Sequence, residues 1–194
     1  MAFTTTFRSL RRVGRKVVLP SDKIKEIVKS QIPLINGGII DLGAGTQYWS
    51  NWLRDAYQTR VYAVDSYYKE KQNCEMPQYT DYFKCIEEID AKALWCCDVL
   101  HHLDIEFKNR VIDSIEDVGY EWIIIKDIDC RRKFGNFMNR VHDRIINHER
   151  IGDIDPKKLE SELQNIDYEV KFYYLPKLWY PHFLLIAHKK KCCF

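Results

Sequence analysis

A glycine turn between a short buried strand and a helix constrains this chain more than any other feature. The apolar segment 39–42 is followed by Gly43-Ala44-Gly45, and a helix is expected to begin near Gln47. In open α/β sheets, ligands bind beyond the carboxyl ends of the strands, where a strand meets the following helix. Glycine has no Cβ, so a ligand can approach the backbone closely, and the helix directs free N–H groups into the same space. The turn therefore predicts an α/β fold with a ligand site at 43–47.

The rest of the chain alternates between apolar runs and helical periodicity, which favours a largely parallel sheet covered by helices. Strands are expected at 39–42, 60–64, 93–98 and 122–126, and helices at 22–32, after residue 47, at 104–118 and after Asp155-Pro156. An apolar stripe at helical spacing comprises Phe134, Phe137, Met138, Val141 and Ile145. Residues 66–92 are polar and tyrosine-rich, with a weak strand expected near 82–85.

The chain closes with two strands, at 168–174 and 182–188, joined by a segment short enough for an antiparallel connection. About five parallel strands with an antiparallel finish are therefore expected. A chain of 194 residues suits one domain. We place that domain at 21–190, between a basic arm at 1–20 and a tail at 191–194.

Composition indicates a soluble protein. The net charge is only +2, so no global field favours nucleic acid or membrane. Seven cysteines are irregularly spaced and form no Cys-x-x-Cys pair, so neither a disulfide framework nor a metal site is expected. No apolar run reaches the roughly 18–20 residues that span a bilayer. No secretory signal is visible, and we expect a cytoplasmic location.

The two ends of the chain are basic. The run from Phe7 to Lys16 has three interpretations: a solvated arm, a patch for a phosphate-bearing or anionic-lipid partner, or an organelle transit peptide. The end of the chain joins three lysines to Cys192 and Cys193. The prenylation pattern fails because Lys191 stands where its cysteine is needed, while palmitoylation and peripheral membrane contact stay open.

An acidic residue narrows the choice of ligand. Asp65 ends the second expected strand, where its carboxylate can accept hydrogen bonds from both hydroxyls of a ribose. The pyrophosphate fingerprint G-x-G-x-x-G requires glycine at the position of Tyr48, and Asp41 stands two residues before the first glycine. These details favour an adenosine-containing cofactor that has no pyrophosphate.

Three segments together resemble a known family. Residues 39–46 resemble motif I of the class I S-adenosylmethionine (SAM)-dependent methyltransferases, 61–65 resemble the strand that follows it, and 97–103 resemble the fourth-strand segment. The resemblance covers roughly residues 37–130. It implies a three-layer Rossmann-like methyltransferase fold, mostly parallel with an antiparallel last strand, and SAM as cofactor.

The same resemblance implies the cofactor contacts. Gly43 and Gly45 would pass under the methionine part of SAM, Asp65 would hold the ribose, and residues 85–87 would flank the adenine. The expected cofactor-binding residues are Asp41, Gly43, Ala44, Gly45, Thr46, Asp65, Ser66, Cys85, Ile86 and Asp98.

Methyl transfer mainly requires alignment of the nucleophile with the methyl group. An oxygen nucleophile also needs a base or a cation to remove its proton or lower its pKa. Residues that could supply these functions lie where the fourth and fifth strands end and the last strand begins. The expected catalytic residues are Asp98, His101, His102, Lys126, Asp127 and His182.

The acceptor has competing interpretations. Asp98 and Lys126 occupy places of two members of the Lys-Asp-Lys-Glu set of ribose 2′-O-methyltransferases, but no glutamate begins the last strand. The pair His101-His102 points instead to enzymes that act on small molecules, lipids or sugars. We expect O-methylation of a small-molecule, lipid- or sugar-linked acceptor. The alternatives are an RNA ribose 2′-O-methyltransferase and a non-catalytic binding or scaffold subunit.

Overall fold

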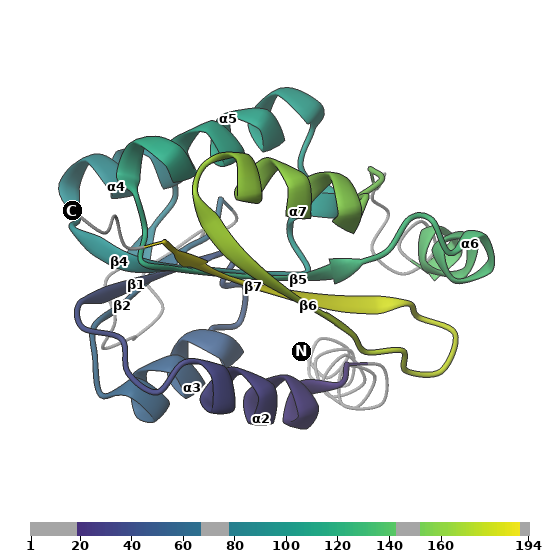
Figure 1. Cartoon of the computed structure of the whole chain (residues 1–194), viewed down its shortest axis with the longest axis horizontal. Coiled ribbons are helices and arrows are strands. Elements are labelled where there is room, and N and C mark those ends of the chain that lie inside the picture. Colours follow the sequence, from purple (N-terminus) through teal and green to yellow (C-terminus); the bar gives the residue numbers. More distant parts are fainter. Residues whose placement is uncertain (1–18, 67–77, 143–151, 191–194) are drawn as a thin grey trace, which may run out of the picture.

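The computed structural model describes residues 19–66, 78–142 and 152–190, and its centre is one seven-stranded sheet (Figure 1). The strand order is β3-β2-β1-β4-β5-β7-β6. The first five strands of that order run parallel, and β7 pairs antiparallel with both β5 and β6. The expected parallel sheet with an antiparallel finish is confirmed. The strands are β1 (Gly38–Leu42), β2 (Val61–Val64), β3 (Gln78–Tyr79), β4 (Ala91–Cys97), β5 (Trp122–Ile128), β6 (Tyr168–Tyr174) and β7 (His182–Lys189).

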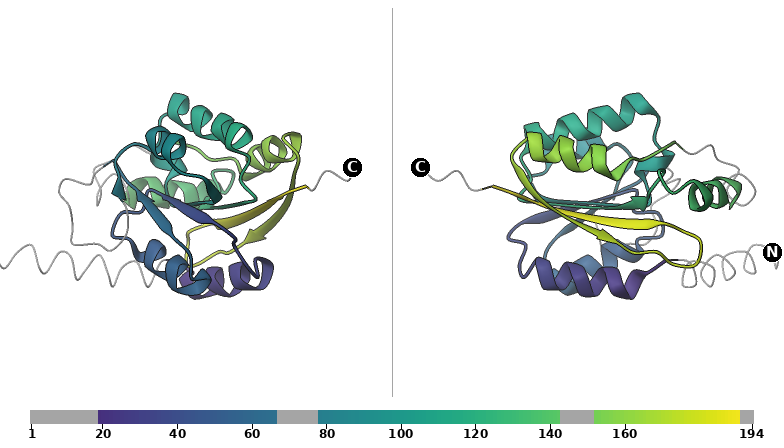
Figure 2. Two further views of the ribbon diagram at one scale, coloured as in Figure 1. Left: turned by 90° about the vertical axis from the view of Figure 1, so that its left-hand side faces the viewer. Right: turned by 45° about the vertical axis from the view of Figure 1, so that its right-hand side comes forward.

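Helices cover both faces of the sheet, which gives three layers (Figures 1 and 2). On one face lie α2 (Ser21–Gln31) and α3 (Tyr48–Tyr57). On the other lie α4 (Tyr82–Glu88), α5 (Ile105–Val118) and α7 (Pro156–Asn165). A 3-10 turn, η1 (Leu100–His102), follows β4, and α6 (Lys133–His142) stands beyond the carboxyl end of β5.

Two hydrophobic clusters, one on each face, hold the layers together. Along β5 the side chains alternate: Ile123 and Ile125 join the cluster under α5 and α7, and Ile124 joins the cluster under α2 and α3. Full burial of an isoleucine side chain is worth about 1.5–3 kcal/mol. Both faces of the sheet are therefore anchored, and the carboxyl edge of β1, β4 and β5 is a fixed platform.

The weak strand expected near 82–85 is wrong, because these residues form α4. The side chain of Asp81 accepts hydrogen bonds from the backbone N–H groups of Phe83 (2.9 Å) and Lys84 (3.4 Å), as an N-cap does. Tyr82 and Cys85, three residues apart, both face the core. The third strand is only Gln78–Tyr79, which pairs with β2.

The described part of the apolar stripe forms a helix as predicted, up to His142, but the inward packing that such a stripe implies is wrong for its first two aromatic residues. Phe134 and Phe137 on α6 are exposed. Ile145, the basic arm up to residue 18 and the tail at 191–194 lie outside the described residues. Within the described ranges, no helix is both long and apolar enough to cross a membrane.

Candidate cofactor and acceptor site

The turn after β1 is bound to the end of β2 and requires glycine. Gly43 and Gly45 have positive φ values of 72° and 50°. The backbone N–H groups of Gly43 and Ala44 both donate to the carbonyl of Val64, at 2.7 and 3.0 Å. A Cβ on Gly43 would lie 2.1 Å from the side chain of Val99, which follows β4. The turn is therefore a tight connection at the centre of the sheet edge.

Asp65 lies directly beside this turn. Its carboxylate accepts a hydrogen bond of 2.7 Å from the backbone N–H of Gly45. Its own N–H donates to the carbonyl of Tyr79 at 2.9 Å, which fixes the end of β2 against β3. Asp65 is half-buried, and Ser66 after it is exposed. The second strand thus ends where the sequence predicted, with its acid within contact of the glycine turn.

Asp41 is buried beneath the turn and holds the start of α3. Ser50 donates to its carboxylate from both its hydroxyl and its backbone N–H. Burial raises the pKa of Asp41 to about 7, although the hydrogen bonds from Ser50 act in the opposite direction. Ser50 is not among the site residues expected from the sequence. Its signal was a small hydroxyl residue in the first turn of the helix after the glycines.

Asp98 and Lys126 form an ion pair across β4 and β5. The side chain of Lys126 is fully buried, whereas that of Asp98 is 35% exposed. Asp98 has a φ of 57°, a left-handed conformation that is uncommon outside glycine. Its partial burial would raise its pKa, but Lys126 outweighs this effect and, with His182 and His101, lowers the pKa to about 2. The pair therefore holds an ionised carboxylate at the end of β4.

His101 and Asp127 form a second pair. Asp127, fully buried, accepts from His101 Nδ1 at 2.5 Å and from the His101 backbone N–H at 3.3 Å. The backbone N–H of Ile128 donates to the same carboxylate at 2.8 Å. An imidazole held through Nδ1 has its orientation fixed and presents Nε2 on the opposite side of the ring. The ring of His102 lies 4.0 Å from that of His101, between centroids.

His182 joins these two pairs from the neighbouring strand, β7. It begins β7, is buried, and pairs in register with Ile128 at the end of β5. Its ring stacks on Tyr180 with centroids 5.7 Å apart. Both His101 and His182 act electrostatically on Asp98, so the Asp98–Lys126 ion pair, the hydrogen-bonded His101–Asp127 pair and His182 form one cluster. The structure thus brings together Asp98, His101, Lys126, Asp127 and His182, with His102 against them.

Sequence comparison adds nothing to this geometry, because no family model matches the chain and no curated protein matches its sequence. Solved structures do match. One is a SAM-dependent methyltransferase from Archaeoglobus fulgidus, with a TM-score of 0.67 and 14% identity over 93% of this chain and 99% of that one. Another is the Burkholderia thailandensis 1,6-didemethyltoxoflavin-N1-methyltransferase with bound S-adenosylhomocysteine, with a TM-score of 0.65 and 12% identity over 98% and 86%.

The chain has the class I methyltransferase fold. A third similar structure, the Pnkp1/Rnl/Hen1 RNA repair complex, has a TM-score of 0.55 and 11% identity over 84% of this chain and 40% of that one. These identities are low, so the fold is what the comparisons establish. It is the three-layer architecture that the motif resemblance implied.

Within this methyltransferase fold, the local geometry suits a cofactor without a pyrophosphate. Tyr48 occupies the place of the third fingerprint glycine, and its ring packs edge-on against Trp49 with centroids 5.0 Å apart. At Gly45, by contrast, an added Cβ would have its nearest contacts at 3.9 Å, so nothing crowds the second glycine. An uncrowded backbone turn and the carboxylate of Asp65 therefore stand side by side.

Two of the expected cofactor residues lie elsewhere in the fold than predicted. Cys85 and Ile86 are on α4 and not at the end of a strand. The Cys85 side chain is fully buried in the core, and burial raises its pKa to about 12. Among the described residues, no group of three His, Cys, Asp or Glu side chains is arranged to hold a metal ion.

Proposed function

We propose that this protein binds SAM over the β1–α3 turn and transfers its methyl group to an oxygen of a small-molecule, lipid- or sugar-linked acceptor. The observation that carries the proposal is the position of the ionisable cluster. Asp98, Lys126, His101, Asp127 and His182 gather at the sheet edge that also carries the glycine turn and Asp65.

Asp65 is proposed as the residue that binds the ribose. Its carboxylate already accepts the Gly45 N–H at 2.7 Å, and a carboxylate has further lone pairs for two hydroxyl donors. Gly43 to Thr46 would allow the methionine part to approach the backbone, and Asp41 would hold α3 in place beneath it. SAM supplies a methyl carbon that is already activated by its sulfonium group. The protein must therefore align the acceptor and manage its proton.

His101 is proposed as the general base. Asp127 fixes the ring through Nδ1 and would stabilise the imidazolium that forms when Nε2 accepts the acceptor's proton. Lys126 is less suited to this step, because its ammonium is fully buried and pairs with Asp98. We assign Lys126 and Asp98 to positioning, and His182 to the wall of the acceptor site beside them.

Two adjacent histidines offer a matched test. We expect His101→Gln to lower the single-turnover rate by about 10²–10⁴-fold, the usual contribution of a general base, with SAM affinity nearly unchanged. His102→Gln removes the same kind of side chain one residue later, at an exposed position, and should retain most of the rate. The acceptor is first found by mass spectrometry, as a product that gains one methyl group in RNA, lipid or sugar pools. Equal losses in both variants would show that His101 is not the base.

An RNA acceptor is the second candidate. The Asp98–Lys126 ion pair is the observation that favours it, since ribose 2′-O-methyltransferases keep an aspartate and a lysine at these two strand ends. The similarity to the Pnkp1/Rnl/Hen1 RNA repair complex points the same way. Against it, His182 stands where that group has a glutamate. Methylation of RNA but not of lipid or sugar pools would favour this candidate. Absence of SAM binding would favour the scaffold alternative.

A further inference from the structure

Two elements that carry exposed apolar side chains meet beyond the carboxyl edge of the sheet. We call this region the α6 rim, and define it by Phe134 and Phe137 on α6 together with Leu178 and Trp179 in the β6–β7 turn. Their exposed fractions are 71%, 61%, 60% and 45%. A Cβ on Gly135 would lie 2.5 Å from both the carbonyl oxygen of Trp179 and the ring of Pro181, so α6 packs directly on the turn. The two elements that carry these four exposed apolar side chains are therefore in direct contact.

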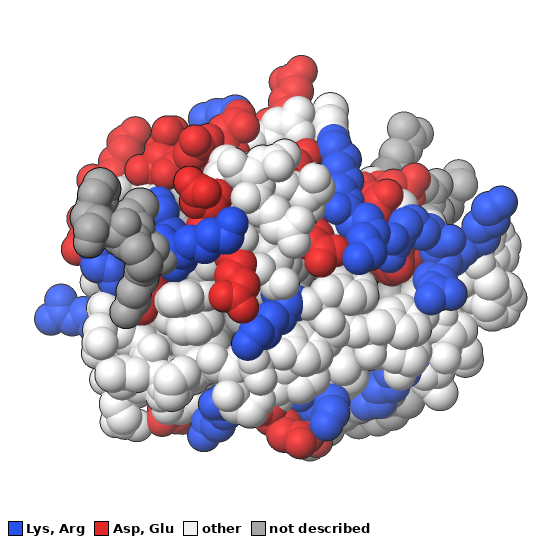
Figure 3. Space-filling model, viewed as in Figure 1, with Lys and Arg blue, Asp and Glu red and all other residues white. Residues whose placement is uncertain are grey.

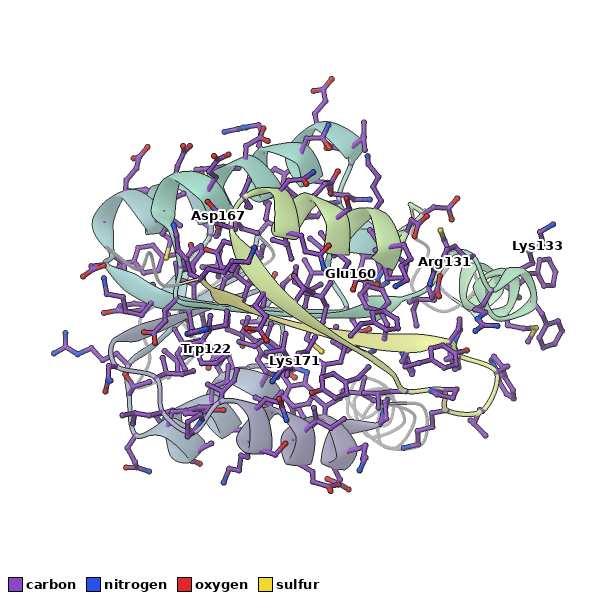
Figure 4. All side chains as sticks on the ribbon, viewed as in Figure 1. Trp122, Arg131, Lys133, Glu160, Asp167 and Lys171 are labelled. Carbon is purple, nitrogen blue, oxygen red and sulfur yellow. The ribbon has the colours of Figure 1, made fainter. Side chains whose placement is uncertain are left out.

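Basic residues border the α6 rim. Arg131, Arg132 and Lys133 precede Phe134, and Figure 3 shows Lys and Arg side chains over this end of the molecule beside uncharged surface. The guanidinium of Arg132 lies 5.0 Å from the ring centre of Tyr174, and Lys133 reaches outward from α6 in Figure 4. Arg131 is bound to the buried carboxylate of Asp129 by two hydrogen bonds of 2.9 and 2.8 Å. Asp129 and Asp155 compensate the charge of Arg131, so the basic border of the rim consists of Arg132 and Lys133.

Leu178 has a backbone conformation in which a turn ordinarily carries glycine or asparagine. Its φ is 56°, in the left-handed region that glycine and asparagine adopt at lower cost. A leucine in that conformation is strained by about 1–2 kcal/mol in general, and with a side chain 60% exposed it recovers little by packing. Stability of the isolated chain therefore does not explain a leucine at this tip.

The start of the described chain lies at the same place. The ammonium of Lys177, in the β6–β7 turn, donates to the carbonyl of Leu19 at 2.8 Å. The eighteen residues before Leu19 therefore join the described structure beside the rim. They contain Arg8, Arg11, Arg12, Arg15 and Lys16 and no acidic residue.

We propose that the α6 rim docks on an anionic membrane surface. Phe134, Phe137, Leu178 and Trp179 enter the boundary between headgroups and acyl chains, and the basic border meets the lipid phosphates. Tryptophan and phenylalanine on a projecting, cation-flanked tip suit that boundary. Leucine and phenylalanine at a convex tip have no comparable gain from a nucleic-acid backbone, which favours a membrane over RNA. Docking here would bring His182, one residue after Pro181, toward the lipid surface. The proposal stands apart from methyl transfer.

Vesicle flotation of the full chain tests it without an activity assay. Vesicles of phosphatidylcholine alone are compared with vesicles that also contain phosphatidylglycerol. We expect wild type to float with the anionic vesicles, and Phe137→Ser and Leu178→Gly to reduce the bound fraction severalfold. Leu34→Ser is the matched control. Leu34 is 55% exposed, but it precedes β1 and so lies at the opposite edge of the sheet. Leu178→Gly should keep or raise the melting temperature, so loss of binding cannot be attributed to unfolding.

A variant with Arg11→Gln and Arg12→Gln in the full chain separates the rim from the basic arm. Reduced binding of the rim variants supports the proposal, whether or not the arm variant also binds less. Binding that depends on the arm but not on Phe137 or Leu178 would overturn it, as would failure of wild type to bind anionic vesicles. A third result would also overturn it: wild type does not bind vesicles but self-associates, and Phe137→Ser dissociates the assembly. That result would identify the rim as a contact between copies of the chain.

Discussion

Asp41 is a carboxyl group whose ionisation the folded state opposes. Its pKa is about 7 in the folded protein because of burial, against 3.8 in the unfolded chain. The folded state therefore holds a proton more strongly between these values, and stability is lost as the pH rises from 3.8 toward 7. For one isolated group, a shift of this size corresponds to about 4 kcal/mol.

Asp41→Asn removes this dependence while keeping an acceptor for Ser50. We expect the variant to lose less free energy of unfolding than wild type between about pH 5 and about pH 8. Urea unfolding at the two pH values measures the difference. Asp55→Asn is the control. Asp55 is largely exposed, so its replacement should leave the pH dependence of the free energy of unfolding as it is in wild type. If the Asp41 variant lost as much free energy of unfolding over this pH range as wild type, Asp41 would not be the group responsible.

Asp65→Ala tests the ribose contact. Loss of a charge-assisted hydrogen bond is worth roughly 1.5–3 kcal/mol, so we expect a rise of about ten- to a hundredfold in the dissociation constant for SAM. Isothermal titration measures it. The melting temperature should be checked alongside, since Asp65 also accepts the Gly45 N–H. A folded variant that binds SAM as well as wild type would exclude this role.

Asp98 and Lys126 should behave as a coupled pair in stability. Asp98→Ala leaves a fully buried ammonium without its carboxylate, and removing one partner of a buried pair commonly costs about 3–5 kcal/mol. The double variant Asp98→Ala/Lys126→Met removes both charges and should recover part of that loss. A double-mutant cycle by chemical denaturation gives the coupling. Additive effects would mean that the ion pair does not contribute to stability.

Part of this residue-scale picture could be predicted from the sequence. The positions of Asp41, Asp65, Asp98 and Lys126 followed from strand ends and the glycine spacing. The partners did not, since the contact of Ser50 with Asp41 and of His101 with Asp127 depends on side-chain directions that no linear pattern specifies.

At the scale of elements, the β1–α3 turn depends on a contact with the segment after β4. A Cβ on Gly43 would meet the branched side chain of Val99 at 2.1 Å, and the φ of 72° disfavours any other residue. The turn and the β4–α5 segment are therefore fitted to each other across the middle of the sheet.

Gly43→Ala should be more damaging than the equivalent change at the end of α5. We expect it to cost about 1–3 kcal/mol from overpacking, in addition to the conformational cost of a positive φ. Gly119→Ala has a similar φ of 65°, but its Cβ would meet only the flexible ammonium end of Lys189. It should therefore show the conformational cost alone. Thermal unfolding compares the two, and adding Val99→Ala should partly rescue only the Gly43 variant. Equal losses of stability in Gly43→Ala and Gly119→Ala would contradict the close contact between position 43 and Val99.

Elements with a regular apolar pattern could be predicted, and the short elements between residues 78 and 88 could not. The buried strands β1, β4 and β5 and the helices α2 and α5 followed from apolar periodicity. The seven-residue α4 was missed because two inward side chains, Tyr82 and Cys85, fit a short strand as well as one helical turn. The signal that separates them is Asp81, an N-cap directly before the first helical residue. For α6, the stripe indicated a helix, but no pattern could indicate that its aromatic face is exposed.

On the scale of the whole molecule, the alternation of strands and helices indicated a parallel sheet, and the final pair of strands indicated its antiparallel edge. The strand order itself depends on which connections cross, and no linear pattern specifies it. The order β3-β2-β1-β4-β5-β7-β6 brings the ends of β1, β2, β4 and β5 to one edge. The glycine turn, Asp65 and the ionisable cluster come from five separate segments and meet only because of this order.

The central claim is that this edge binds SAM, and calorimetric titration of the full chain with SAM, S-adenosylhomocysteine and NAD tests it most directly. We predict saturable binding of SAM and of S-adenosylhomocysteine, with one site per chain, and no binding of NAD. NAD lacks a place for its pyrophosphate because Tyr48 replaces the third fingerprint glycine. Binding of NAD in place of SAM, or no binding of either SAM or S-adenosylhomocysteine at millimolar concentration, would contradict the account.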